Sequence, residues 1–270
     1  MWFEKRRKSM NRRNFLCTAG MGTLAMATFQ PLTQLAQAAS KDMAIKAIGF
    51  DGFPIFDPRP IFTLVRSVFP EHGGFGKTWF DKIFAYTWLR TGGDQYVDFY
   101  TVIGQALDYA VDHHGVSVTH EQKRQLMDVW LNLKPWPDVP AALDQFERQG
   151  IKLAFLSNLT EEMLRSNARN GGIEDRFQYF STDRVRAFKP APKAYQMGVE
   201  HFGLPKRNIA FCAFGGWDAV GASWFGYPTV WVNRFGHKPE NLDQKLIITG
   251  EGINVLTRFA EQRNGVPKTP

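Results

Sequence analysis

Four residues of this chain have side chains suited to nucleophilic catalysis and stand where predicted strands end. Asp51 follows the apolar run 44–50 and precedes Gly52, a pattern typical of a buried strand that stops at a tight turn. The others are Ser157, Lys189 and Asp218, each just beyond a later predicted strand. Taken singly, they could be a turn carboxylate, a capping serine, a surface lysine and a helix-start aspartate.

Together these four residues fit one reaction. Asp51 would be a nucleophile that forms a covalent ester. Ser157 would donate a hydrogen bond to this carboxylate or to the bound substrate, and Lys189 would keep Asp51 ionised and stabilise developing negative charge. Asp218 would orient Lys189 or help to activate the water that cleaves the ester. Because the carboxyl ends of parallel strands meet at one crevice, we expect the four side chains to lie together.

The second half of the chain alternates predicted strands with predicted helices. We expect strands at 151–156, 177–181, 208–214 and 229–232, and helices at 160–170, 192–202 and 218–225. Such alternation predicts an α/β fold with a Rossmann-like parallel sheet and helices on both faces.

Residues 58–136 interrupt this alternation with helical periodicity and many aromatic residues. We interpret them as a helical cap subdomain, inserted between core segments 39–57 and 137–270. Most of the aromatic side chains should form the core of the cap, and a few should face the crevice. Pro135 and Pro137 mark the return to the α/β core.

Residues 1–38 look like a twin-arginine signal peptide. Arg12-Arg13-Asn14-Phe15-Leu16 precedes a moderately apolar stretch that ends near Phe29, and Ala36-Gln37-Ala38 is a typical cleavage site. This order predicts export to the periplasm of a bacterium, with the twin-arginine translocase as a transient partner. An uncleaved membrane anchor and a cytoplasmic protein with a basic tail are the alternatives.

Composition argues against a nucleic-acid partner and against a disulfide. The chain has a net charge of +7, but residues 1–38 hold six basic residues against Glu4, so the remainder is close to neutral. Cys17 lies in the leader, which leaves Cys212 alone in the mature chain.

Several motifs together resemble the haloacid dehalogenase superfamily, and specifically its type II 2-haloacid dehalogenases. They are Phe50-Asp51-Gly52, Tyr86-Thr87-Trp88-Leu89-Arg90, Leu156-Ser157-Asn158, Lys189-Pro190 with Tyr195, Trp217-Asp218-Ala219, and Trp231-Val232-Asn233-Arg234. The resemblance implies a sheet core with a helical cap and a small-molecule substrate. It also implies hydrolysis without metal or cofactor, in which Asp51 displaces halide from C2 of a 2-halo carboxylic acid with inversion. Water then releases a 2-hydroxy acid. Relatives are often homodimers.

Two other functions stay open. Phosphatases of this superfamily place a second aspartate two residues after the nucleophile, where this chain has Phe53, and acidic metal ligands where it has Ala213-Phe214-Gly215-Gly216. We therefore expect no magnesium site and rank phosphatase activity lower. The other alternative is a periplasmic ligand-binding or vestigial protein on the same scaffold.

The predicted substrate contacts depart from the family pattern. The first motif lacks the family's threonine, the family's arginine aligns with Phe80, and its serine and asparagine align with Ala213 and Gly215. A buried substrate carboxylate needs a cationic partner, and Arg59 is our candidate, with a solvated surface arginine as the alternative. If no arginine reaches the crevice, the substrate lacks a carboxylate or is larger and more apolar.

The remaining substrate-binding candidates are aromatic or amide side chains, each with a structural alternative. Tyr195 matches a family active-site tyrosine but could be packing, and Asn158 could be a strand-end cap. The rings of Phe53, Phe80 and Trp217 could line an apolar pocket or belong to the core.

Overall fold

A six-stranded parallel sheet forms the centre of the protein. The computed structural model describes residues 43–244 and 246–265. The strand order is β3-β2-β1-β4-β5-β6, and every neighbouring pair is parallel, which confirms the predicted α/β fold. The strands are β1 (Ala47–Phe50), β2 (Lys152–Ser157), β3 (Gln178–Ser181), β4 (Ile209–Ala213), β5 (Thr229–Val232) and β6 (Ile247–Gly250).

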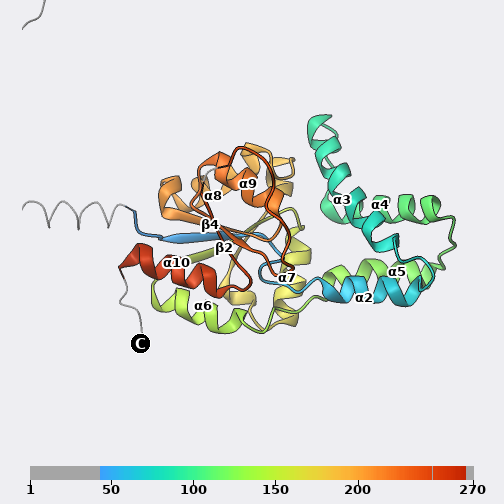
Figure 1. Ribbon diagram of the computed structural model, residues 1–270, viewed down its shortest axis with the longest axis horizontal. Coiled ribbons are helices and arrows are strands. Elements are labelled where there is room, and N and C mark those ends of the chain that lie inside the picture. The colour runs from blue at the N-terminus through green and yellow to red at the C-terminus, as the bar shows by residue number, and fades with distance from the viewer. Residues whose placement is uncertain (1–42, 245, 266–270) are drawn as a thin grey trace, which may run out of the picture.

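Helices cover both faces of the sheet, because alternate strand residues point to opposite sides. Ile48 and Phe50 pack in one apolar cluster with three helices, and Leu156 and Phe211 pack in a second cluster with two helices on the other face. Figure 1 shows these two layers above and below the strands. The first three helices are α6 (Val139–Arg148), α7 (Glu161–Asn170) and α10 (Asn254–Asn264), and the other two are α8 (Pro192–Phe202) and α9 (Gly216–Phe225).

Strand β6 and helix α10 were not predicted from the sequence. The strand is short and only partly buried, so its residues lack the continuous apolar run that marks the central strands. Helix α9 begins at Gly216, slightly earlier than predicted, and β4 ends at Ala213.

Four helices between β1 and α6 form the separate group on the right of Figure 1. All four lie inside the range 58–136 expected for the cap. The indole N–H of buried Trp79 donates to the carbonyl of Ile103 at 2.9 Å and so links two of the helices. The four are α2 (Arg59–Val68), α3 (Phe75–Gly92), α4 (Phe99–His114) and α5 (His120–Asp128), and the short 3₁₀ helix η1 (Val129–Leu131) follows them.

The two chain segments that join cap and core run side by side. Phe56 and Pro135 form an isolated antiparallel bridge. Next to it, the Asp57 N–H donates to the Lys134 carbonyl and the Trp136 N–H donates to the Ile55 carbonyl, both at 2.9 Å. This pairing fixes where the cap leaves the core and therefore which face it turns toward Asp51.

The predicted export signal and its cleavage site lie outside the described residues. Within residues 43–244 and 246–265, no helix combines the length and apolar character needed to cross a membrane.

The close approach of α9 to α8 depends on a glycine. A Cβ on Gly221 would lie 2.5 Å from the Tyr195 hydroxyl and 2.7 Å from Cβ of Pro190. We expect Gly221→Ala to lower the free energy of unfolding by about 1–3 kcal/mol, because overpacking forces neighbours apart. Urea denaturation measures this change.

The matched control is Gly104→Ala, in the interior of α4. The nearest atom to its added Cβ is the flexible end of Met127, at 3.7 Å. Here alanine should be neutral or stabilising by up to about 1 kcal/mol, because it favours a helix over glycine. Equal urea midpoints for Gly221→Ala and the wild type would contradict the packing argument.

Candidate active site

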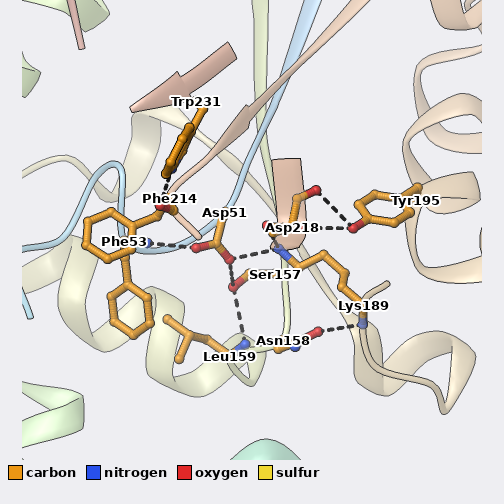
Figure 2. A network of polar contacts seen from close by, with 10 residues as sticks. All are labelled: Asp51, Phe53, Ser157, Asn158, Leu159, Lys189, Tyr195, Phe214, Asp218 and Trp231. Carbon is orange, nitrogen blue, oxygen red and sulfur yellow. Dashed lines mark hydrogen bonds and ion pairs between the residues drawn. The ribbon is translucent and has the colours of Figure 1, made fainter. Parts of the chain in front are cut away.

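The parallel sheet brings the four predicted catalytic residues to one edge. Asp51 directly follows β1, and Ser157 is the last residue of the neighbouring β2. Asp218 lies in the first turn of α9, after β4 on the other side of β1, and Lys189 lies between β3 and α8. Figure 2 shows their side chains converging below the strand ends.

Lys189 is the centre of this cluster. Its ammonium group donates to Asp51 Oδ1 at 2.8 Å and to Asp218 Oδ2 at 2.6 Å. The side chains of Lys189 and Asp218 are each only 1% exposed, whereas that of Asp51 is 14% exposed. One buried cation therefore joins two carboxylates, of which Asp51 is the one with access to solvent.

Burial and charge act against each other on the two hidden groups. Burial disfavours the charged form of Lys189, but the negative charges of Asp218 and Asp51 outweigh it, so the pKa of Lys189 is raised. Burial also raises the pKa of Asp218, to about 6, although Lys189 acts in the opposite direction. Lys189 is therefore a cation at neutral pH, and Asp218 titrates near neutrality.

Tyr195 supports Asp218 rather than contacting the crevice. It is fully buried in α8, and its hydroxyl donates to Asp218 Oδ1 at 2.7 Å. Its carbonyl accepts a hydrogen bond from the Tyr227 hydroxyl at 2.6 Å. The prediction that Tyr195 binds substrate is corrected, because both oxygens of Asp218 are occupied and the tyrosine ring is enclosed by the core.

The turn after β2 links Asp51 to Lys189. The Ser157 hydroxyl lies 3.4 Å from Asp51 Oδ1, as a long hydrogen-bond donor, and accepts from the Leu159 N–H at 3.2 Å. Asn158 Oδ1 accepts from the backbone N–H of Lys189 at 2.9 Å. This leaves the Asn158 NH₂ group as a donor at the crevice, so the residue both caps the strand end and lines the site.

A cavity of about 320 Å³ opens above Asp51, between the cap and the core. Its described lining residues include Asp51, Ser157, Asn158 and nine aromatic side chains. The cap supplies Phe62, Phe80, Phe84 and Phe99. The core supplies Phe53, Phe214, Trp217, Trp231 and Phe235. The structure therefore places Phe53, Phe80 and Trp217 in the crevice, as expected for an apolar pocket.

Arg59 does not take part in this cavity, so its predicted role as the carboxylate partner is corrected. Its guanidinium forms a two-pronged pair with Asp57, with Nε to Oδ2 at 2.8 Å and an NH₂ group to Oδ2 at 2.6 Å. The side chain is 60% exposed, and its guanidinium lies 4.6 Å from the centre of the Trp136 ring. The local ion pair turns Arg59 outward at the start of α2.

The segment after β5 supplies lining residues that the sequence did not identify: His237, Lys238 and Glu240. The Asn233 side chain holds this segment, since its Oδ1 accepts from the His237 N–H at 2.9 Å and its Nδ2 donates to the His237 carbonyl at 2.8 Å. The sequence feature that could have identified this segment is the position of Asn233, directly after a predicted strand. No arginine lines the cavity among the described residues, whereas Lys238 does.

Comparison with known proteins identifies the family. A family model described as a haloacid dehalogenase-like hydrolase matches residues 24–226. This chain belongs to the haloacid dehalogenase-like hydrolases.

Relatives within this family are 2-haloacid and haloacetate dehalogenases. The (S)-2-haloacid dehalogenase of Pseudomonas sp. (strain YL) is 34% identical over 203 residues, which cover 74% of this chain and 88% of that protein. Haloacetate dehalogenase H-2 of Moraxella sp. (strain B) is also 34% identical, over 74% of this chain and 91% of its own. A crystal structure of an L-2-haloacid dehalogenase superposes with a TM-score of 0.78 at 32% identity, covering 81% of this chain and 99% of that one.

The described residues contain no group of three or more His, Cys, Asp or Glu side chains arranged to hold a metal ion. Next to Asp51, Phe53 offers an apolar ring and a backbone N–H, the latter 3.4 Å from Asp51 Oδ2.

Proposed function

We propose that this protein hydrolyses the carbon–halogen bond of a 2-halo carboxylic acid through an ester on Asp51. The observation that carries this proposal is the Asp51 carboxylate, held by buried Lys189 on the floor of an apolar cavity. The dehalogenase relatives named above support the choice of reaction.

The two oxygens of Asp51 have different surroundings, and we assign them different roles. Oδ1 accepts from Lys189 at 2.8 Å, and Ser157 approaches it at 3.4 Å. Among the described residues, Oδ2 has only the long contact from the Phe53 N–H, at 3.4 Å. Oδ2 is therefore the free nucleophile: it bonds to C2 while the electron pair of the C2–halogen bond leaves with the halide, and C2 inverts.

In the second step water attacks the Asp51 carboxyl carbon. Oδ1 is then the ester carbonyl oxygen, and Lys189 and Ser157 are placed to stabilise the negative charge that develops on it. Asp218 positions Lys189 for this step, since its buried Oδ2 accepts from the ammonium group at 2.6 Å. Collapse of the intermediate releases the 2-hydroxy acid and restores Asp51.

Lys238 is our candidate partner for the substrate carboxylate in place of Arg59. It lines the cavity and makes no ion pair with the other described residues, and Asn233 fixes the turn just before it. Glu240 lines the same rim, with its carboxylate beside Gly216 at the positive N-terminus of α9. The Asn158 amide supplies a neutral donor to the same ligand.

Two further parts of the proposal rest on the sequence. The twin-arginine pattern and cleavage site support export to the periplasm through the twin-arginine translocase. Assembly as a homodimer is proposed only from the resemblance to the family.

Asp51→Asn is the direct test of the nucleophile. We expect it to lower halide release from 2-halo acids by about a thousandfold or more, because an amide is a poor nucleophile and only the binding contacts remain. Ion chromatography of halide, with and without a chelator, measures the effect. In ¹⁸O water, a single wild-type turnover should place the label in the Asp51 carboxylate, which mass spectrometry of the peptide detects.

The same experiment separates the alternatives. Ligand binding that survives Asp51→Asn, with no halide from any 2-halo acid in the wild type, would favour a binding or vestigial role. Chelator-sensitive release of phosphate from phosphate esters would favour a phosphatase.

The pKa of Asp218 predicts the acid side of the pH profile. With its pKa raised to about 6, Asp218 is mainly a carboxylate above that pH and mainly a neutral acid below it, where Lys189 loses one of the two negative charges that hold it in place beside Asp51. We expect kcat to fall about tenfold per pH unit below that value. Asp218→Asn should lower the plateau and remove this limb, and an unchanged limb in the variant would assign it to another group.

Replacing Lys238 should change KM, because this residue is the proposed partner of the substrate carboxylate. Lys238→Gln should raise KM for a 2-halo acid about three- to tenfold and leave kcat nearly constant, since the carboxylate contact is the same before and during the reaction. Lys238→Arg should restore most of the loss. Initial-rate kinetics at low ionic strength measure both constants, and wild-type KM in Lys238→Gln would place the carboxylate elsewhere.

A further inference from the structure

The aromatic residues that line the cavity indicate which substrates fit it, and the catalytic residues on its floor do not. Nine rings line it, from both cap and core, whereas the polar floor consists of Asp51, Ser157 and Asn158. The reaction itself needs only C2 at Asp51 and the carboxylate at Lys238 and Asn158. The rings therefore surround a part of the ligand that takes no part in the reaction.

Contacts among the rings hold these walls in place. In the cap, Phe62 and Phe80 stack with their centroids 4.4 Å apart, and Phe80 stacks on buried Trp130 at 5.3 Å. Phe84 meets Trp217 across the gap between cap and core at 5.4 Å. Because these rings support one another, the cavity is a preformed apolar site and not a gap that collapses when empty.

The size of the cavity fits a larger ligand than a two- or three-carbon acid. Its volume is about 320 Å³, and pockets that enclose drug-sized ligands begin near about 300 Å³. A short acid seated on Asp51 would leave most ring faces in contact with water. A ligand with its own large apolar group would displace that water, which is favourable in proportion to the apolar area buried.

We propose that the cleft takes 2-halo acids that carry an aryl or comparably large apolar group on the carbon next to C2. This inference rests on the proposed function and specifies its substrate class. The aryl group lies among the rings that line the cavity, C2 lies at Asp51, and the carboxylate lies at Lys238 and Asn158. The reaction is RCHX–COO⁻ plus water to RCH(OH)–COO⁻, halide and a proton, with R the large group.

The test compares two probes with the same reacting carbon, 2-bromopropionate and 2-bromo-3-phenylpropionate, on the full-length protein. We expect kcat/KM for bromide release to be at least about tenfold higher for the phenyl compound, since even one methylene in an apolar pocket changes specificity by about tenfold or more. 1-Bromo-2-phenylethane, which has the ring but no carboxylate, should release bromide more slowly than the phenyl acid.

A variant pair then assigns the preference to the cavity. Phe84→Ala removes a lining ring, and Tyr86→Ala removes a ring from the same helix that packs against Tyr109 outside this cavity. We expect the ratio of kcat/KM for the phenyl acid to that for 2-bromopropionate to fall about tenfold in Phe84→Ala and to stay near the wild-type value in Tyr86→Ala. Phe62→Ala serves as a second lining variant if Phe84→Ala does not fold.

The outcomes separate this inference from the reaction itself. Bromide release with equal or higher kcat/KM for 2-bromopropionate would overturn the substrate class and leave the dehalogenase function intact. Faster release from 1-bromo-2-phenylethane than from the phenyl acid would overturn the requirement for a carboxylate. No bromide from any probe would refute the proposed function on which the inference rests.

Discussion

The ion pair of Lys189 with Asp51 and Asp218 is the interaction on which the rest of the structure depends. Its cation and one of its carboxylates are almost fully buried, so removing Lys189 leaves two neighbouring carboxylates without a cation, and loss of a buried partner destabilises a fold by about 3–5 kcal/mol. The three residues come from three separate segments of the core. The network is therefore satisfied only when β1, β4 and the segment before α8 reach one edge of the sheet together.

This constraint explains several local features. Gly221 allows α9 to approach Tyr195, whose hydroxyl donates a hydrogen bond to Asp218 Oδ1. Asn158 holds the backbone N–H of Lys189, so the cation is fixed at both its backbone and its ammonium group. With Lys189 fixed, its ammonium group holds Asp51 Oδ1, while the long contact from the Phe53 N–H is the only one that the described residues make with Oδ2. The proposed chemistry depends on the difference between the two Asp51 oxygens. This difference therefore arises from the packing that fixes Lys189 and Asp218.

The sequence predicted the parallel sheet and the positions of Asp51, Ser157, Lys189 and Asp218, because apolar runs and strand-end polar residues are local signals. It did not predict β6, whose burial depends on contacts with distant parts of the chain. The prediction that Arg59 binds the substrate carboxylate was wrong for a local reason. Asp57, two residues earlier, forms an ion pair with its guanidinium, and sequence spacing does not reveal this. Tyr195 was assigned to substrate because it matches a family active-site tyrosine, and sequence spacing gives its helix but not the direction in which its ring points. Lys238 was missed because its segment has no periodic pattern and is fixed by the side chain of Asn233.

The cap and the core divide the proposed activity between them. The ionic floor belongs entirely to the core, whereas the aromatic walls come in nearly equal parts from both. An apolar wall strengthens the electrostatic interactions on the floor, since less water competes with Lys189 for Asp51. It also limits the water available for the second step to what enters at the more polar rim around Lys238. A change of ring in α2 or α3 alters the shape offered to the substrate but leaves the Lys189 pairs untouched. Substrate choice in this protein can therefore change through the cap, while the reaction depends on a charge network that lies wholly in the core.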